Sequence, residues 1–191
     1  MANFSTPILF VVAAWLAMIP HLSLVSGTNI RLIDFQSNCI DLPRTTASLD
    51  APQAAAVGTF PCVNNRAGFT WVATLTGLTN FNITSAVVPS IVLSVAAVGN
   101  TAPSSSIPLI DQPVLGRAGS IMTWKFVSNP NFSGKFNIVP TISPGGVVVA
   151  LRSYPKRPAT VTPNVDATYT PLFLDTLNVK DPQQVFTIQN V

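Results

Sequence analysis

The sequence contains no glutamate, and its single histidine, His21, lies in the apolar N-terminal stretch. A Ser-His-Asp or Cys-His catalytic arrangement has no histidine to use after that stretch, and neither has a histidine-based metal site. A glycosidase needs two opposed carboxylates, and we interpret the aspartates that cluster early in the sequence chiefly as exposed turn residues. We therefore expect a protein that is not an enzyme and that has no metal site and no cofactor.

Charged residues are scarce, at 9% of the 191 residues, and the 10 lysines and arginines are scattered. Nucleic-acid binders carry dense basic stripes, so nucleic acid is not an expected partner. The one local basic cluster runs from Arg152 to Pro158. We interpret it as a solvated loop, with contact to an anionic glycan or a membrane surface as the alternative.

The first 27 residues have the pattern of a secretory signal peptide. Residues Ile8 to Ile19 form an apolar run that Pro20 closes, and small residues follow at Ser26 and Gly27, which predicts cleavage after Gly27. The apolar run is shorter than the ~20 residues of a membrane span, although an uncleaved anchor is the alternative. We expect a secreted, extracellular protein with one domain over residues 28–191 and no stable membrane association after cleavage.

Cysteine usage agrees with export, because Cys39 and Cys62 are the only two cysteines and stand 23 positions apart. In an oxidising compartment such an isolated pair is most simply one structural disulfide. Closing a loop of this length contributes roughly 3 kcal/mol in the chain-entropy model.

The remaining chain has an all-β pattern. Segments rich in Val, Ile, Phe and Thr alternate with Pro, Gly, Asn and Ser, and no stretch after Gly27 keeps a helical period for three turns. Four strands are predicted in each of three units, at residues 29–34, 39–42, 54–60 and 69–74, then 80–84, 91–96, 107–110 and 122–127, then 135–141, 147–152, 170–174 and 185–189.

A short motif returns three times and defines these units. It reads Asn-Ile-Arg-Leu from Asn29, Phe-Asn-Ile-Thr from Phe81 and Phe-Asn-Ile-Val from Phe136. An aromatic anchor closes each unit, and the three anchors are Trp71, Trp124 and Phe186. The repeat predicts one closed domain in which Ile30, Ile83 and Ile138 take equivalent positions.

Twelve strands in three such units resemble a β-trefoil, and the first unit resembles the ricin-B-type lectins. The resemblance rests on Cys39-Ile40-Asp41-Leu42, on the strand from Val57 to Cys62 that ends Phe60-Pro61-Cys62, and on Phe69-Thr70-Trp71. It implies a secreted carbohydrate-binding module. In that family an aspartate on the second strand accepts hydrogen bonds from sugar hydroxyls, and an aromatic on the third strand stacks on the sugar.

Asp41 and Phe60 stand at those two places, and Asn64 and Asn65 lie close enough in sequence to add polar contacts. In the other units the repeat places Ser94 and Val149 where Asp41 stands, so neither keeps the carboxylate. We therefore expect at most one sugar site, in the first unit, with glycans or glycoproteins as weakly bound partners.

Two other functions fit the same fold. A β-trefoil protease inhibitor would act through the proline-rich 154–171 loop, with Lys156 and Arg157 at its tip and a protease as partner. A secreted, non-catalytic protein that kept the fold without sugar binding is the third hypothesis, because fold alone does not determine function.

Two N-glycosylation sequons follow the leader, at Asn82-Ile83-Thr84 and at Asn131-Phe132-Ser133. Asn131 follows a proline in a predicted turn and is the better acceptor, since glycosylation needs an accessible loop. Asn82 lies inside a predicted strand, which favours an unmodified or partly modified site.

Overall fold

The structure is a computed structural model that describes residues 27–42, 55–62, 67–99, 101, 108–154 and 170–191. Asn64, Asn65, residues 1–26 of the expected signal peptide and residues 155–169 of the predicted inhibitor loop lie outside these ranges. None of the helices within the described ranges combines the length and the hydropathy that crossing a membrane requires.

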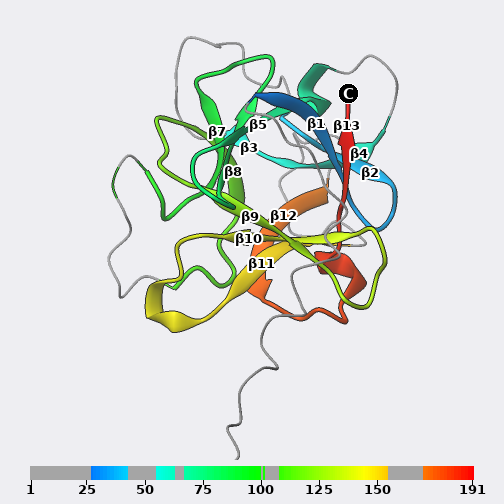
Figure 1. The fold of residues 1–191 in the computed structure, drawn as a ribbon. Coiled ribbons are helices and arrows are strands. Elements are labelled where there is room, and N and C mark those ends of the chain that lie inside the picture. The colour runs from blue at the N-terminus through cyan, green and yellow to red at the C-terminus, as the bar shows by residue number, and fades with distance from the viewer. Residues whose placement is uncertain (1–26, 43–54, 63–66, 100, 102–107, 155–169) are drawn as a thin grey trace, which may run out of the picture.

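Short strands make up most of the described chain, with three single-turn 3-10 helices between them (Figure 1). The strands are β1 (Thr28–Ile33), β2 (Asn38–Asp41), β3 (Ala55–Ala56), β4 (Gly58–Pro61), β5 (Trp71–Leu75), β6 (Phe81–Ser85), β7 (Ile91–Val95), β8 (Val114–Ala118), β9 (Trp124–Ser128), β10 (Phe136–Pro140), β11 (Val149–Ser153), β12 (Thr170–Thr176) and β13 (Thr187–Asn190). The helices are η1 (Ala67–Phe69), η2 (Pro144–Gly146) and η3 (Pro182–Gln184).

Six of the strands close into a barrel. Strand β1 pairs antiparallel with β13 and β5, β5 pairs with β6, β6 with β9, and β9 with β10. A bridge between Phe136 and Phe186 joins the start of β10 to the residue before β13 and completes the ring. Figure 1 shows β13 running beside β1, so the last strand of the chain closes on the first.

Six of the other strands form three hairpins, β2 with β4, β7 with β8, and β11 with β12, and the short strand β3 pairs with β8. These hairpins also meet one another: β12 pairs with β4, and Pro113 bridges to Phe173 next to β8. A six-stranded barrel with three hairpins, one from each repeat unit, is the β-trefoil architecture that the repeat predicts.

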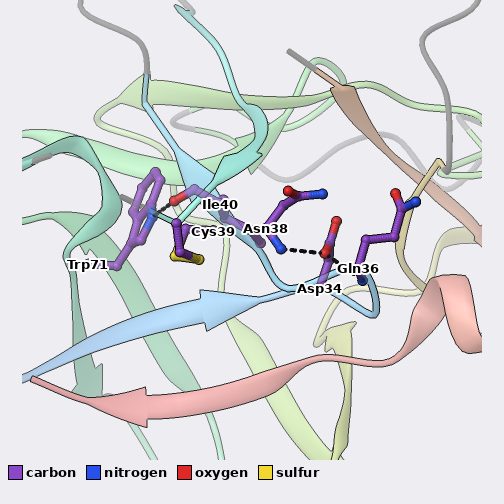
Figure 2. The surroundings of a disulfide bond; sticks show 7 residues. Asp34, Gln36, Asn38, Cys39, Ile40 and Trp71 are labelled. Atoms are coloured by element: carbon purple, nitrogen blue, oxygen red, sulfur yellow. Dashed lines mark hydrogen bonds between the residues drawn. A yellow bond between two sulfur atoms is a disulfide. The ribbon is translucent and has the colours of Figure 1, made fainter. Parts of the chain in front are cut away.

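The aromatic anchors are confirmed as equivalent core residues. Trp71, Trp124 and Phe186 are fully buried. The indole of Trp71 donates to the carbonyl of Ile40 at 3.1 Å, as Figure 2 shows, and Trp124 donates to Leu93 at 2.9 Å. Each indole therefore fastens its barrel strand to the first strand of its own hairpin, whereas the ring of Phe186 has no N–H to donate.

The repeat frame of the first unit is corrected by two residues. Each anchor pairs with the first barrel strand of its own unit, and the partners are Ile30, Phe81 and Phe136. Leu32, and not Ile30, is therefore the residue of the first unit that is equivalent to Ile83 and Ile138. Both candidates are fully buried, so apolar character alone could not fix the frame.

The third strand of the second unit was predicted at residues 107–110, which is wrong, because β8 occupies Val114–Ala118. Gly116 lies in the middle of this strand, where glycine is uncommon. A Cβ at Gly116 would lie 2.7 Å from Ile91 Cγ2 and 2.8 Å from Leu42 Cδ1. The side chains of Ile91 on β7 and of Leu42, directly after β2, therefore fill the space that a side chain at this position needs.

Candidate functional site

The three hairpins meet at a pseudo-threefold axis, which identifies equivalent positions. Val57 donates its N–H to the Val114 carbonyl at 3.3 Å. The Pro113 bridge to Phe173 sets Val114 against Leu172, and the pairing of Pro171 with Gly58 sets Leu172 against Val57. Val57, Val114 and Leu172 are all buried and therefore occupy one position in the three units.

The residues that follow these three pair across their hairpins with Asp41, Ser94 and Arg152. We call this the hairpin position. Ser94 is confirmed as the counterpart of Asp41, but Val149 is wrong and Arg152 takes its place. The connection from β10 to β11 is three residues longer than that from β6 to β7 and contains η2, which shifts the frame.

In the first unit the hairpin position is closed. Asp41 is fully buried, and a Cβ on Gly68 of η1 would lie 2.2 Å from its Oδ1. Phe60 is 3% exposed and packs in a small cluster with Cys39 and Phe69. The structure thus brings Asp41 and Phe60 onto one hairpin but buries both, and their predicted neighbours Asn64 and Asn65 lie outside the described residues.

The predicted disulfide between Cys39 and Cys62 is present, with Cα atoms 5.0 Å apart. Beside it, the turn between β1 and β2 is organised by Asp34, whose Oδ1 accepts the N–H groups of Gln36 at 2.9 Å and Asn38 at 2.8 Å (Figure 2). Asp34 Oδ2 accepts from the Ser153 hydroxyl at 2.8 Å. This buried aspartate therefore joins the first unit to the third and has a structural role, instead of the exposed turn position that we predicted.

In the second unit the polar side chain at the hairpin position, Ser94, forms its hydrogen bonds with other groups of the same unit. The Ser94 hydroxyl lies 2.7 Å from that of Ser120 and donates to the Val98 carbonyl at 3.1 Å. Arg117, further along the same hairpin, donates Nη1 to the Ala96 carbonyl at 2.9 Å. Both side chains thus satisfy backbone or neighbouring groups, and Ser94 is buried.

The third unit differs, because its hairpin position belongs to a partly exposed cluster of charged groups. Arg152 forms an ion pair with Asp175, donates Nε to Gln183 Oε1 at 2.9 Å and lies 3.6 Å from Asp181 Oδ2. The side chains of Arg152, Asp175 and Asp181 are 26%, 28% and 17% exposed. The cluster thus places a guanidinium and two carboxylates, each partly exposed, in contact with one another.

Aromatic rings flank these charges. The Arg152 guanidinium lies over the Tyr154 ring, 5.1 Å from its centroid, and Tyr154 contacts Phe173 edge to face at 5.5 Å. We define the third-unit cluster as Arg152, Tyr154, Asp175, Asp181 and Gln183. It combines hydrogen-bond donors, acceptors and an aromatic ring, one face of which the guanidinium covers.

A buried amide network holds the segment that supplies Asp181 and Gln183. Asn137 is fully buried and donates to the Gln184 carbonyl at 2.8 Å, while its Oδ1 accepts from Asn129 at 2.8 Å. Gln184 in turn donates to the Thr176 carbonyl at 2.8 Å. Because each amide is satisfied by the fold, the short helix η3 is fixed against the barrel.

Sequence reasoning missed Asp175, Asp181 and Gln183. Residues 152–158 stood out as a basic cluster, but nothing in the sequence shows that the chain returns to Arg152 from residues 23 to 31 positions away. The spacing from the anchors could have identified Gln183. It stands three residues before Phe186, as Gly68 stands three residues before Trp71, so the two residues take equivalent positions. Within the described ranges, no three His, Cys, Asp or Glu side chains gather as a metal site would require.

Comparison with known proteins adds evidence on the fold. No family model matches the sequence, and no curated protein matches it. Among solved structures, the Rhizoctonia solani agglutinin is similar with a TM-score of 0.61 and 14% identity over 87% of this chain and 97% of its own. The designed threefold-symmetric protein ThreeFoil is similar with a TM-score of 0.60 and 12% identity, over 85% and 99%.

A mosquitocidal holotoxin is similar with a TM-score of 0.60 and 14% identity. The match covers 89% of this chain but 18% of the toxin chain, so the likeness concerns one part of a much larger protein. At such low identities these likenesses show the fold and not the ligand. The protein is a β-trefoil.

Proposed function

We propose that the protein is a secreted, non-catalytic β-trefoil that binds carbohydrate through the third-unit cluster. The observation that carries this proposal is the partly exposed arrangement of Arg152, Asp175 and Asp181 beside Tyr154. Sugar hydroxyls are donors and acceptors at once, so a guanidinium next to carboxylates can bind two neighbouring hydroxyls. The ring of Tyr154 offers an apolar surface for the C–H face of a sugar.

The solved structures support this ligand class by analogy. One of the three similar proteins is named as an agglutinin, and it shares the fold over almost its whole length. The third-unit cluster lies at the hairpin position, which corresponds to the place of Asp41 in the first unit. Its chemistry differs from that of the predicted site, since an arginine replaces the aspartate.

The predicted site of Asp41, Phe60, Asn64 and Asn65 stays a second proposed contact. Because Asp41 and Phe60 are buried, we expect the third-unit cluster to bind glycans more tightly than this site does. The two locations make opposite predictions for paired variants, so one experiment separates them.

The test is binding of the purified protein to a glycan array and to immobilised galactose, with Asp175→Asn and Asp41→Asn compared with wild type. Both substitutions remove one negative charge and keep the side-chain shape. We expect wild type to bind and Asp175→Asn to lose at least ~10-fold in affinity, because a hydrogen bond to a charged group contributes about 1.5 kcal/mol or more. Asp41→Asn should bind like wild type when it is folded.

Circular dichroism and unfolding midpoints of both variants serve as the control for folding. Wild-type protein that binds no glycan contradicts the proposed function as a whole. Binding that survives Asp175→Asn but disappears in folded Asp41→Asn contradicts the third-unit cluster and supports the first-unit site.

A further inference from the structure

The two sequons lie in very different structural settings. Asn82 is the second residue of β6, a barrel strand that pairs with β5 on one side and with β9 on the other. Asn131 is exposed and stands in the turn between β9 and β10. Its N–H donates to Asn129 Oδ1 at 2.8 Å, so the turn is formed locally and does not depend on the Asn131 side chain.

The amide of Asn82 is partly enclosed. Its Oδ1 is buried and has no hydrogen-bond partner within the part of the chain that the structure describes. The equivalent residue of the third unit, two positions before the motif's end, is Asn137, which is fully buried. Both asparagines lie between core residues of their strands, so their side chains point to the face opposite the barrel core. At Asn137 that face is covered by Asn129 and by Gln184 of η3, and at Asn82 the Oδ1 atom is likewise covered by protein.

Attachment of a sugar sets a geometric requirement at Oδ1. A glycosylated asparagine is a secondary amide, which is planar and trans like a peptide bond. The first sugar carbon then lies opposite Cβ, on the same side of the amide as Oδ1. Because that side is buried at Asn82, a sugar there would enter space that neighbouring protein atoms already occupy.

Asn131 meets no such obstacle. Its amide nitrogen donates to the Val179 carbonyl at 3.1 Å in an exposed hydrogen bond, and the side chain lies at the surface of the turn. The third residue of this sequon, Ser133, is also exposed. The turn can therefore carry a large polar group without displacing any core residue.

We propose that Asn131 carries an N-linked glycan in the secreted protein and that modification of Asn82 is incompatible with the folded barrel. The glycan would stand over the turn that contains Val179, on the third unit. This inference concerns modification and is independent of the proposed carbohydrate binding.

The experiment expresses the full chain in a eukaryotic secretory host and maps peptides of the secreted fraction with and without peptide N-glycosidase, which converts a glycosylated asparagine to aspartate. We expect conversion at Asn131 in most molecules and none at Asn82. Asn131→Gln and Ser133→Ala should each abolish the glycosidase-dependent mass shift, whereas Asn82→Gln should leave it unchanged.

The wild-type peptide map gives an answer even where a variant is not secreted. Conversion at Asn82 in secreted, folded protein overturns the proposal, and so does secreted protein that is unmodified at Asn131. Full-chain protein that is retained in the cell and modified at Asn82, next to a secreted fraction modified at Asn131 alone, supports it.

Discussion

The first and third units differ in the charge and the burial of the side chain at the hairpin position. In the first unit, Asp41 lies fully buried against Gly68 of η1. In the third unit, Arg152 reaches outward to Gln183 of η3. The two short helices are equivalent, since each ends two residues before the anchor of its unit. Gly68 has no side chain, so its backbone packs directly on Asp41 and buries it. Gln183 stands at the equivalent position of the third unit, and its side chain bonds to Arg152 near the surface.

The largest effect is expected from Gly68→Ala, which tests how tightly the first unit is closed. The new Cβ would lie 2.2 Å from Asp41 Oδ1 and 2.8 Å from the Leu42 carbonyl oxygen, so the backbone must shift. We expect a loss of about 3 kcal/mol in the free energy of unfolding, measured by urea denaturation. Gly77→Ala is the control, because its nearest contact is 3.6 Å, and it should change stability by less than ~0.5 kcal/mol.

A double-mutant cycle sharpens this result. Asp41→Ala removes the closest atom that the Gly68→Ala side chain meets but leaves the Leu42 carbonyl in place. The combined variant should therefore recover part of the stability that Gly68→Ala loses. Equal losses with and without Asp41 would mean that the carboxylate does not limit the space at residue 68.

The next effect concerns the disulfide, which the first unit has and the third lacks among its described residues. Replacing both Cys39 and Cys62 by alanine frees a loop of 23 residues, and we expect a loss of about 3 kcal/mol, or somewhat less where the unfolded chain keeps residual structure. Urea unfolding of wild type with and without reductant gives an independent measure. Glycan binding should be unchanged in the folded variant without the disulfide. If binding is weaker, the disulfide of the first unit influences the third-unit cluster.

The anchors allow a third comparison of the units. Trp71→Phe removes the bond to the Ile40 carbonyl and leaves a small cavity, so we expect a loss of about 2 kcal/mol, and Trp124→Phe should behave alike. The third unit already has phenylalanine at this position, and Phe186 is fully buried without such a bond. Thermal unfolding of the two variants would show a smaller effect if the third unit's arrangement is equally favourable in the others.

Apolar periodicity predicted the three units and the three anchors, because burial constrains those residues directly, and the count of two cysteines in an exported chain predicted the disulfide. It did not resolve the frame of the first unit, where Ile30 and Leu32 are both core residues. It also misplaced the hairpin position of the third unit, since an insertion before β11 carries no hydrophobic signal. Asp175 and Asp181 approach Arg152 only through tertiary folding, so no local pattern could assign them to one site.

The smallest effect on stability is expected from Asp175→Asn, although its effect on binding should be large. The ion pair with Arg152 is about a quarter exposed on each side, and such pairs contribute roughly 0 to 1 kcal/mol because water screens them and the side chains lose freedom. Arg152 also keeps its bond to Gln183, so it is not left without a partner. A variant that unfolds near the wild-type urea concentration yet fails to bind glycan would assign the third-unit cluster to the surface instead of the core. A loss of several kcal/mol in the free energy of unfolding would instead show that Arg152 and Asp175 stabilise the fold, as Asp34 and Ser153 do. The third-unit cluster would then have a structural role and would not be a binding site.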